Sequence, residues 1–468
     1  MQKPMASVFL CLSVLLILSL ASASSPSSIT LSLSPITSSL TSTNSWDFVA
    51  DITKFTLQRA YHLKTPHKRP SSALHGSTET PLYPKSYGGY SVSLAFGTPP
   101  QKIPLVFDTG SSLMWVPCTK SYTCDNCTFS HVDPKKITTF KLRRSKTFRI
   151  VDCRSRKCGW LYGSDVQARC PGSRPQECPM YLMQYGLGLT SGRPITETLD
   201  LPGNIIGNFF LGCSVYSVQQ PQGIAGFGRA PTSLPNQLKL RKFSYCLLSH
   251  DFDDKPKSSP LTLIGTKSSA AGRAHGVKYT PLLKNPSKSP YNEYYYIHLT
   301  KITVGKNKTK VKLQSKFLVP SPTGNGGTIV DSGSTFTFMD AALYGPLIKE
   351  MAAQTMHYKR AHEAEVRSGF GLCYDIPDAR NVSFPELVFH FKGGAVMELP
   401  VANYFSFMTD LSVWCLTIIS ESSPAGPSVP VGPAIILGNY QQQDFYVEYD
   451  LAHHRLGFKR QKCGLKKE

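Results

Sequence analysis

Residues 107–112 read Phe-Asp-Thr-Gly-Ser-Ser, and residues 330–335 read Val-Asp-Ser-Gly-Ser-Thr. Each stretch places an aspartate, Asp108 or Asp331, at the end of an apolar run and follows it with a hydroxyl residue, a glycine and two more hydroxyl residues. Two unrelated tight turns are the alternative, because aspartate and glycine both favour turns. Since average residue usage makes this motif uncommon, its repetition favours a chain with two halves built on the same plan.

The repeated motif has a chemical reason if the two halves face each other. Asp108 and Asp331 would then share one site, and because two adjacent carboxylates cannot both ionise cheaply, the pair would hold one proton over an acidic range. The ionised member would accept a proton from a water molecule while the protonated member donates to a substrate carbonyl. These two residues are therefore the candidate catalytic pair of a hydrolase.

The residues beside the aspartates suit such a site. Glycine at the turn allows the backbone to approach closely. A hydroxyl group can hydrogen-bond a carboxylate and hold its orientation, which we expect of Ser111 and Ser334, or it can bond the opposite loop, which we expect of Thr109 and Ser332. The residues predicted to support the dyad are Thr109, Gly110, Ser111, Ser332, Gly333 and Ser334.

The composition is that of a globular protein rich in strands. The chain has 468 residues, of which 41% are hydrophobic, 17% are charged, 35 are glycine and 35 are proline. Abundant glycine and proline favour many strands and turns over helical bundles. After the signal-like start there is no apolar run long enough to span a membrane. No fixed short period indicates a helical repeat array or a collagen-like fibre.

The N-terminus has the layout of a secretory signal peptide. Lys3 precedes an apolar run over residues 8–20, and small residues follow it. Residues 1–23 are therefore predicted to be the signal, with a buried helix or an anchor as the alternative. Secretion to the extracellular space, apoplast or cell wall is the expected destination, and the vacuole is the other.

A removable segment is predicted between the signal and the folded body. Residues 24–80 begin with a Ser-, Thr- and Pro-rich stretch and contain one amphipathic helical pattern over residues 46–63. A flexible arm is the other interpretation of this composition. If the segment is an inhibitory pro-segment, its basic residues Lys54 and Arg59 would face the dyad.

The cysteines and sequons agree with secretion. Twelve cysteines lie outside the predicted signal, and this even number indicates six disulfides in an oxidising compartment. The CxxC at residues 124–127 has no second CxxC or CxH pair beside it, so we expect a structural bridge and neither a metal nor another cofactor. Acceptor sequons for glycosylation lie at Asn126, Asn307 and Asn381. The twelve cysteines are Cys118, Cys124, Cys127, Cys153, Cys158, Cys170, Cys178, Cys213, Cys246, Cys373, Cys415 and Cys463.

The folded body divides into two predicted lobes. Short apolar runs punctuated by Gly, Pro and Asn indicate strands throughout, and only residues 341–356 have the pattern of a long helix. A Lys-, Ser- and Pro-rich stretch at residues 251–260 is the preferred linker, with residues 284–290 as the alternative. The N-terminal lobe is therefore placed at residues 81–258 and the C-terminal lobe at 259–468.

From about Tyr83 to Cys463 the chain resembles the pepsin-like aspartic proteases. Residues 111–116 continue the first motif as that family does, and residues 224–226 and 436–438 are similar to its two apolar-apolar-glycine strands behind the active-site loops. This resemblance implies a mainly β, bilobal fold with the active-site cleft between two related lobes. It also implies a secreted aspartic-type endopeptidase that works at acidic pH.

The resemblance extends to a hairpin that closes over the substrate, called the flap in this family. It implies that Tyr185 and Gly186 belong to the flap and that Tyr185 hydrogen-bonds Trp115. Residues 185–189 read Tyr-Gly-Leu-Gly-Leu, whereas the plant nepenthesin-type branch usually has Tyr-Gly-Asp-Gly-Ser. Leu187 therefore removes polar contacts that the branch makes to a substrate backbone.

The dense cysteines between Cys118 and Cys178 are similar to those of the plant nepenthesin-type branch. No long saposin-like insert separates the halves, which also favours this branch. The disulfides that the resemblance implies are Cys118–Cys124, Cys127–Cys213, Cys153–Cys178, Cys158–Cys170, Cys246–Cys463 and Cys373–Cys415.

A protein of another class remains as the alternative function. Xylanase-inhibitor-like proteins share this fold and cysteine pattern, so the chain could be a catalytically weak or inactive secreted relative that binds a glycanase. The survival of both aspartates and their hydroxyl partners favours the enzyme. No Gly-x-Ser-x-Gly, His-Glu-x-x-His, phosphate-loop or dinucleotide motif indicates another chemistry.

The charge indicates a surface for anions. The net charge is +21, and ten basic residues lie between Lys135 and Lys157, where Asp152 is the only acid. Secretion argues against nucleic acid as the partner. An acidic cell-wall polysaccharide is one explanation, and a solvated, disulfide-bonded loop is the other. Protein or peptide substrates are the expected partners of a monomer.

Overall fold

The structure is a computed structural model of the whole chain. The described residues are 28–36, 45–64, 89–119, 121–127, 137–163, 170, 176–186, 188–220, 222–249, 258–265, 274–376, 382–408, 412–421 and 432–464. The predicted signal, Leu187 and the sequon Asn381 lie outside the described residues. Among the described residues, no helix is long and apolar enough to cross a membrane.

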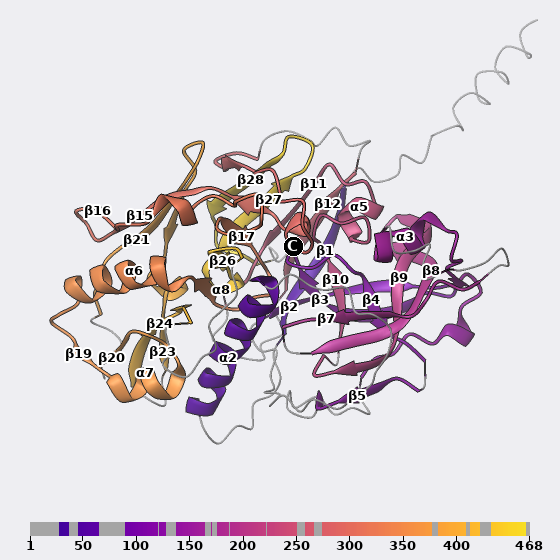
Figure 1. Cartoon of the computed structure of the whole chain (residues 1–468), viewed down its shortest axis with the longest axis horizontal. Coiled ribbons are helices and arrows are strands. Elements are labelled where there is room, and N and C mark those ends of the chain that lie inside the picture. Colours follow the sequence, from indigo (N-terminus) through magenta and orange to yellow (C-terminus); the bar gives the residue numbers. More distant parts are fainter. Residues whose placement is uncertain are drawn as a thin grey trace, which may run out of the picture.

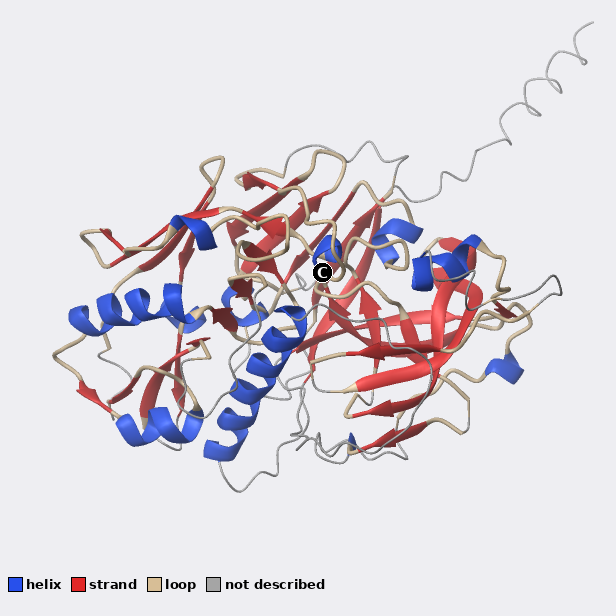
Figure 2. Ribbon diagram, viewed as in Figure 1, coloured by secondary structure: helices blue, strands red, loops and turns tan. Residues whose placement is uncertain are grey.

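One large sheet contains the strands of the N-terminal half and joins it to the other half (Figures 1 and 2). Its members are β1 (Ser28–Ile36), β2 (Gly89–Phe96), β3 (Gln101–Asp108), β4 (Trp115–Pro117), β5 (Thr123–Asp125), β6 (Arg149–Ile150), β7 (Tyr181–Gln184), β8 (Leu189–Leu201), β9 (Asn204–Val218), β10 (Gly223–Gly226), β11 (Lys242–Cys246), β12 (Ser259–Ile264), β13 (Lys278–Pro281), β27 (Phe445–Asp450) and β28 (Arg455–Arg460). Its order is β13-β28-β27-β11-β12-β1-β2-β3-β10-β4-β9-β8-β6, with β5 beside β9 and β7 beside β8. The last hairpin of the chain, β27–β28, therefore pairs with β11 of the first half.

Three smaller sheets form most of the C-terminal lobe, on the left of Figure 1. The first, in the order β14-β17-β26-β18-β25, consists of β14 (Tyr296–Ile297), β17 (Thr328–Val330), β26 (Ile435–Leu437), β18 (Thr337–Met339) and β25 (Ile418–Ile419). The second consists of β16 (Thr309–Lys310), β15 (Leu299–Val304), β21 (Leu387–Phe391) and β22 (Val396–Leu399). The third consists of β19 (Lys359–Arg360), β20 (Cys373–Asp375), β24 (Val413–Leu416) and β23 (Phe405–Met408).

The described helices are few, as the composition predicts. The α-helices are α2 (Ser45–Lys64), α3 (Arg156–Tyr162), α5 (Leu234–Gln237), α6 (Ala341–Gln354), α7 (His362–Ser368) and α8 (Asn439–Gln442). Four short 3₁₀ turns are η3 (Leu142–Arg144), η5 (Tyr291–Glu293), η6 (Ser315–Phe317) and η8 (Val401–Asn403). The two helices predicted from periodicity, over residues 46–63 and 341–356, correspond to α2 and α6.

The two halves repeat one local topology around the aspartates. In the first half, β10 pairs parallel with β3 and antiparallel with β4, so that Ile224 lies opposite Trp115. In the second half, β26 pairs parallel with β17 and antiparallel with β18, so that Ile436 lies opposite Phe338. The mainly β, bilobal fold that the resemblance implies is confirmed, and in it Phe338 takes the position that Trp115 has in the first lobe.

Buried aromatic side chains fill the junction between the lobes. Phe243 of β11 stacks on Tyr449 of β27 with ring centroids 4.3 Å apart. Tyr295 meets the same Tyr449 edge-on at 4.7 Å, and Phe107 of β3 meets Phe227 in the same way at 4.7 Å. Such pairs add to the stabilisation from burial alone, so the two active-site loops rest on a rigid base.

The described cysteines form six disulfides, but four of the pairs differ from those that the resemblance implies. Cys246–Cys463 and Cys373–Cys415 are as implied. The others are Cys118–Cys213, Cys124–Cys127, Cys153–Cys170 and Cys158–Cys178. The register explains the first: β4 runs parallel to β9, with Val116 opposite Cys213, so the end of β4 brings Cys118 beside Cys213 with Cα atoms 5.2 Å apart. In the second, the intervening turn brings the two ends of the CxxC together, with Cα atoms 5.7 Å apart.

Candidate active site

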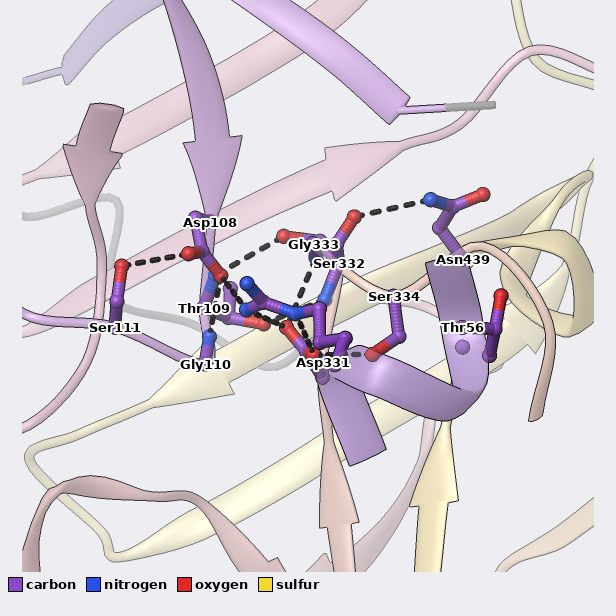
Figure 3. Close-up of polar contacts among 12 residues, drawn as sticks. Thr56, Asp108, Thr109, Gly110, Ser111, Asp331, Ser332, Gly333, Ser334 and Asn439 are labelled. Atoms are coloured by element: carbon purple, nitrogen blue, oxygen red, sulfur yellow. Dashed lines mark hydrogen bonds and ion pairs between the residues drawn. The ribbon is translucent and has the colours of Figure 1, made fainter. Parts of the chain in front are cut away.

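The two predicted aspartates come together at the centre of the molecule. Asp108 is the last residue of β3, and Asp331 directly follows β17. Because β3 and β17 end at the same point from opposite lobes, the two carboxyl groups face each other (Figure 3). Both side chains are at most 1% exposed. The sequence motif therefore corresponds to one site and not to two separate turns.

Each carboxylate is held by its own loop in the same way. Asp108 accepts hydrogen bonds from the Gly110 N–H (2.9 Å) and the Ser111 hydroxyl (2.6 Å). Asp331 accepts the corresponding bonds from the Gly333 N–H (2.9 Å) and the Ser334 hydroxyl (2.6 Å). The predicted orienting role of the two serines matches these contacts, which are drawn in Figure 3.

The two loops are joined by reciprocal hydrogen bonds. The Thr109 N–H donates to the Ser332 hydroxyl (3.0 Å), and the Ser332 N–H donates to the Thr109 hydroxyl (2.9 Å). Each hydroxyl then donates to a main-chain carbonyl of the other lobe, Thr109 to Val330 (3.1 Å) and Ser332 to Phe107 (3.0 Å). All these groups are buried, so the bonds fix the separation of the carboxylates.

Glycine is required at the turns because each loop lies against the opposite carboxylate. A Cβ atom at Gly110 would lie 2.4 Å from Asp331 Oδ1, and a Cβ atom at Gly333 would lie 2.6 Å from Asp108 Oδ1. Real side chains do not make such short contacts. The backbone therefore supplies the walls of the site.

A helix from the predicted pro-segment places a cation between the carboxylates. Arg59 of α2 donates from Nη2 to Asp108 Oδ1 at 2.7 Å and from Nε to Asp331 Oδ2 at 2.7 Å. The same Nη2 lies 3.0 Å from Asp331 Oδ1. The Arg59 side chain is 6% exposed. Lys54, the other basic residue expected to face the dyad, is instead exposed on α2.

The electrostatics of this arrangement give the two carboxyl groups different pKa values. Burial raises the pKa of Asp108 to about 6; the Arg59 charge opposes that shift and the Asp331 charge adds to it. Burial also acts to raise the pKa of Asp331, but the charge of Arg59 and the hydrogen bonds from Arg59 and Ser334 outweigh it and hold that pKa below its ordinary value. The pair is therefore arranged to keep one proton in mildly acidic solution.

The flap hairpin of β7 and β8 lies on the same helix. Its turn is closed by the Tyr185 N–H donating to the Gly188 carbonyl at 2.6 Å. A Cβ atom at Gly186 would lie 2.5 Å from the Arg59 Cα atom, so the flap glycine packs directly against α2. This hairpin therefore covers α2 at Arg59.

Tyr185 and Trp115 are neighbours, with ring centroids 6.4 Å apart. Burial raises the pKa of Tyr185, and the polar contact with the Trp115 side chain opposes that shift. Gly186, the next residue, rests on α2, so this end of the hairpin contacts both Trp115 and the helix.

Some residues of the site were not predicted from the sequence. Asn439, at the start of α8, donates from its side chain to the Ser332 carbonyl (3.0 Å) and from its N–H to the Ser334 carbonyl (2.7 Å). Its only signal was its place directly after the apolar-apolar-glycine strand. Lys64 and Asp340, which form an ion pair at the end of α2, had no signal because they are 276 positions apart.

Two family models cover most of the chain. The match to the model described as xylanase inhibitor N-terminal spans residues 90–265, and the match to xylanase inhibitor C-terminal spans residues 294–460. A probable aspartyl protease of Arabidopsis thaliana is 32% identical over 426 residues, which covers 80% of this chain and 82% of that protein. Aspartic proteinase nepenthesin-1 of Nepenthes gracilis is 31% identical over 424 residues and covers 88% of both chains. Nepenthesin-2 of the same plant is 32% identical over 392 residues, covering 82% of this chain and 80% of that protein.

Solved structures share the fold at lower identity. The crystal structure of edgp has a TM-score of 0.61 and 18% identity, and the alignment covers 93% of this chain and 95% of that one. Basic 7S globulin from soybean has a TM-score of 0.59 and 20% identity, and the alignment covers 81% of this chain and 96% of that one. The fold, together with the relatives' names, defines an aspartic-type endopeptidase. Within that class the chain belongs to the nepenthesin-type branch of the pepsin-like aspartic proteases.

Proposed function

We propose that Asp108 and Asp331 form the catalytic dyad of a secreted endopeptidase that hydrolyses peptide bonds at acidic pH. One observation supports this most strongly: two buried carboxyl groups face each other from matched loops, each held by a glycine N–H and a serine hydroxyl. A protein that only binds a partner has no evident use for hydrogen-bond donors placed in the same way around two facing carboxyl groups.

The mechanism uses the single proton that the pair holds. With the helix gone, a water molecule would lie between the carboxyl groups. The ionised carboxylate takes a proton from the water as its oxygen attacks the carbonyl carbon of the substrate, and the protonated carboxyl gives its proton to the carbonyl oxygen. The resulting gem-diol then collapses: one of its hydroxyls returns a proton to the carboxylate that had given one up, the C–N bond breaks, and the proton taken from the water passes to the leaving nitrogen. No metal or organic cofactor enters these steps.

We also propose that residues 24–80 are an inhibitory pro-segment and that the chain is a zymogen. The Arg59 guanidinium lies where the water would lie, and α2 lies under the flap where the substrate would lie. The strand β1 of the same segment pairs with β12 and β2 in the large sheet. The segment is therefore attached to the rest of the chain at two separate places, and α2 is the part that covers the carboxylates.

The test is cleavage of a denatured protein at about pH 4, where such a dyad holds one proton, with and without pepstatin. Asp108→Asn and Asp331→Asn variants are the matched controls, because asparagine keeps the size of the side chain. Pepstatin-sensitive cleavage by the acid-processed protein, lost in both variants, is expected. A folded single variant that still cleaves would refute the dyad.

A glycanase-binding protein is the second candidate, because both matching family models carry the description of xylanase inhibitors. That function needs no proton-sharing pair. Inhibition of a xylanase by the protein, unchanged in Asp108→Asn, together with no peptide cleavage after removal of the pro-segment, would favour it.

Several further properties stay proposals of the same kind. The signal at residues 1–23, glycosylation at Asn126 and Asn307, the lobe boundary near residue 258 and a monomeric state all follow from the sequence reasoning. Both sequons are exposed, which glycosylation requires. The basic residues of the Lys135–Lys157 stretch that are described are exposed apart from the partly buried Lys157. Retention on a pectin matrix at low salt would support the acidic-polysaccharide partner.

A further inference from the structure

A second cation of α2 lies buried in a pocket of the C-terminal lobe. Lys64 is the last residue of the helix, and its side chain is 2% exposed. Its ammonium group donates to the Asp340 carboxylate and, at 2.9 Å, to the Pro433 carbonyl oxygen. The same nitrogen lies 5.1 Å from the centre of the Phe338 ring, within the range of a cation–π contact. An ammonium group removed from water needs such partners, and this pocket supplies two oxygen acceptors and a ring face.

The walls of the pocket are fixed by the C-terminal lobe itself. Asp340 follows β18 and begins α6; its N–H donates to the Ala434 carbonyl at 2.8 Å, and its carbonyl accepts from the Leu343 N–H at 2.8 Å. Gly432 lies against the helix so closely that a Cβ atom there would be 2.5 Å from the Lys64 Cα atom. None of these wall residues belongs to residues 24–80, so the pocket persists when the pro-segment leaves.

The pocket is close enough to the dyad to be reached by a bound peptide. Lys64 follows Arg59 by five residues, which is roughly 7.5 Å along a helix axis. An extended peptide covers that distance in about two to three residues. Between the two cations, Ala60 and Leu63 pack on an aromatic wall of the C-terminal lobe that includes Tyr291, Tyr294 and Tyr296. Release of α2 would expose this wall together with the pocket.

We propose that the pocket of Asp340, Pro433 and Phe338 is a substrate subsite for a lysine side chain, and that Lys64 occupies it in the zymogen in place of the substrate. This inference rests on the proposed function. The enzyme would thus prefer lysine within three residues of the scissile bond. Glu421 adds to the negative character of the site, because its carboxylate lies beside Asp340 and accepts from the N–H of the next residue, Ala341, at 3.4 Å.

The first test compares two sets of peptides. In each set one position near the scissile bond is fixed in turn, as lysine in one set and as norleucine in the other, and all other positions are the same. The acid-processed enzyme should cleave the lysine pool at one position about tenfold faster in kcat/KM, which is the scale of a charge-assisted hydrogen bond. Asp340→Asn should bring that ratio close to one and leave norleucine peptides almost unchanged. Asparagine is a good residue at the start of a helix, so the variant should fold. Glu363→Gln, at an exposed carboxylate of α7, is the matched control.

The second test measures binding without catalysis. An amidated, labelled peptide of residues 45–64 is titrated into the processed protein, and then the same peptide with Lys64→Met. The substitution should weaken binding about tenfold in the wild-type protein and have little effect in Asp340→Asn, a non-additivity expected of groups in contact. If this holds but no peptide is cleaved, the pocket stands and the proposed function falls.

The preference for lysine should depend on pH. Burial raises the pKa of Asp340 to about 6, with Lys64 of α2 opposing the shift and Glu421 of the loop after β25 adding to it. The carboxyl group is then mostly neutral at about pH 4, so the lysine-to-norleucine ratio should be smaller there than at about pH 6. Two results would overturn the inference: peptides are cleaved with no preference for lysine at any position, or Asp340→Asn leaves the lysine-to-norleucine ratio unchanged.

Discussion

Arg59 Nε lies 2.7 Å from Asp331 Oδ2, and the same guanidinium reaches Asp108 with its Nη2 atom. One residue of a helix therefore satisfies both acids of the candidate dyad, and the three side chains are almost completely buried. The contact neutralises the carboxylates and excludes water from between them. If residues 24–80 are a pro-segment, as proposed, this contact connects their removal with the exposure of the candidate dyad.

Removing this contact should make the full-length protein active without acid processing. Arg59→Met leaves an apolar side chain against two carboxyl groups, and breaking a buried ion pair typically costs 3–5 kcal/mol. The helix should therefore dissociate readily, and pepstatin-sensitive cleavage should appear in unprocessed protein at about pH 5, where one member of the dyad is still protonated. Lys54→Gln, on an exposed part of α2, should remain as latent as the wild type. Equal latency of Arg59→Met would count against the role of the arginine.

Acid should release α2 only below the ordinary pKa of an aspartate. The lowered pKa of Asp331 stabilises the helix-bound state above about pH 4, and this stabilisation is lost as the pH falls through the lowered value. Arg59 also holds the pKa of Asp108 below the value that burial alone would give, so protonation of Asp108 near pH 6 weakens the contact, whereas the Arg59–Asp331 pair persists to lower pH. Hydrogen exchange of residues 45–64 as a function of pH measures the release. A midpoint near or above pH 6 would contradict this account.

The bonds between the loops should matter for stability and for rate. Ser332→Ala removes a hydroxyl that accepts from Thr109 and donates to Phe107. At about 1 kcal/mol for each net hydrogen bond, the free energy of unfolding should fall by about 2 kcal/mol, and kcat should fall because the carboxylates lose their fixed separation. Ser121→Ala, at an exposed hydroxyl that bonds the Thr119 hydroxyl two residues away, is the control. Thermal unfolding and steady-state kinetics of the two variants give the comparison.

The glycine of the second loop should tolerate no side chain. In Gly333→Ala the new methyl group would lie 2.6 Å from Asp108 Oδ1, so one of the two carboxylates must move. Displacement by about 1 Å in an active site typically costs about a hundredfold in rate. Gly159→Ala lies in α3 with nothing within 4 Å of the added atom, and it should keep full activity with slightly raised stability. A Gly333→Ala enzyme with normal kcat would show that the loops are less tightly packed than described.

Local patterns predicted the parts of the fold that depend on neighbouring residues. Short apolar runs predicted strands, the amphipathic pattern of residues 46–63 predicted α2, and the repeated motif placed both aspartates at the ends of apolar runs. Some details needed tertiary information. The implied pairs Cys127–Cys213 and Cys118–Cys124 were not found, because disulfide pairing depends on the register of β4 against β9.

The sequence by itself determined the two halves, the candidate dyad and the residues proposed to support it, because each motif lies within six consecutive positions and its chemistry follows from residue type. Only the tertiary structure decided which cations of α2 meet which carboxylates. Periodicity shows that a helix has an apolar face, but not which surface that face packs against. Arg59 therefore meets Asp108 and Asp331, and Lys64 meets Asp340, because the apolar side of α2 packs on the C-terminal lobe and buries both cations with it.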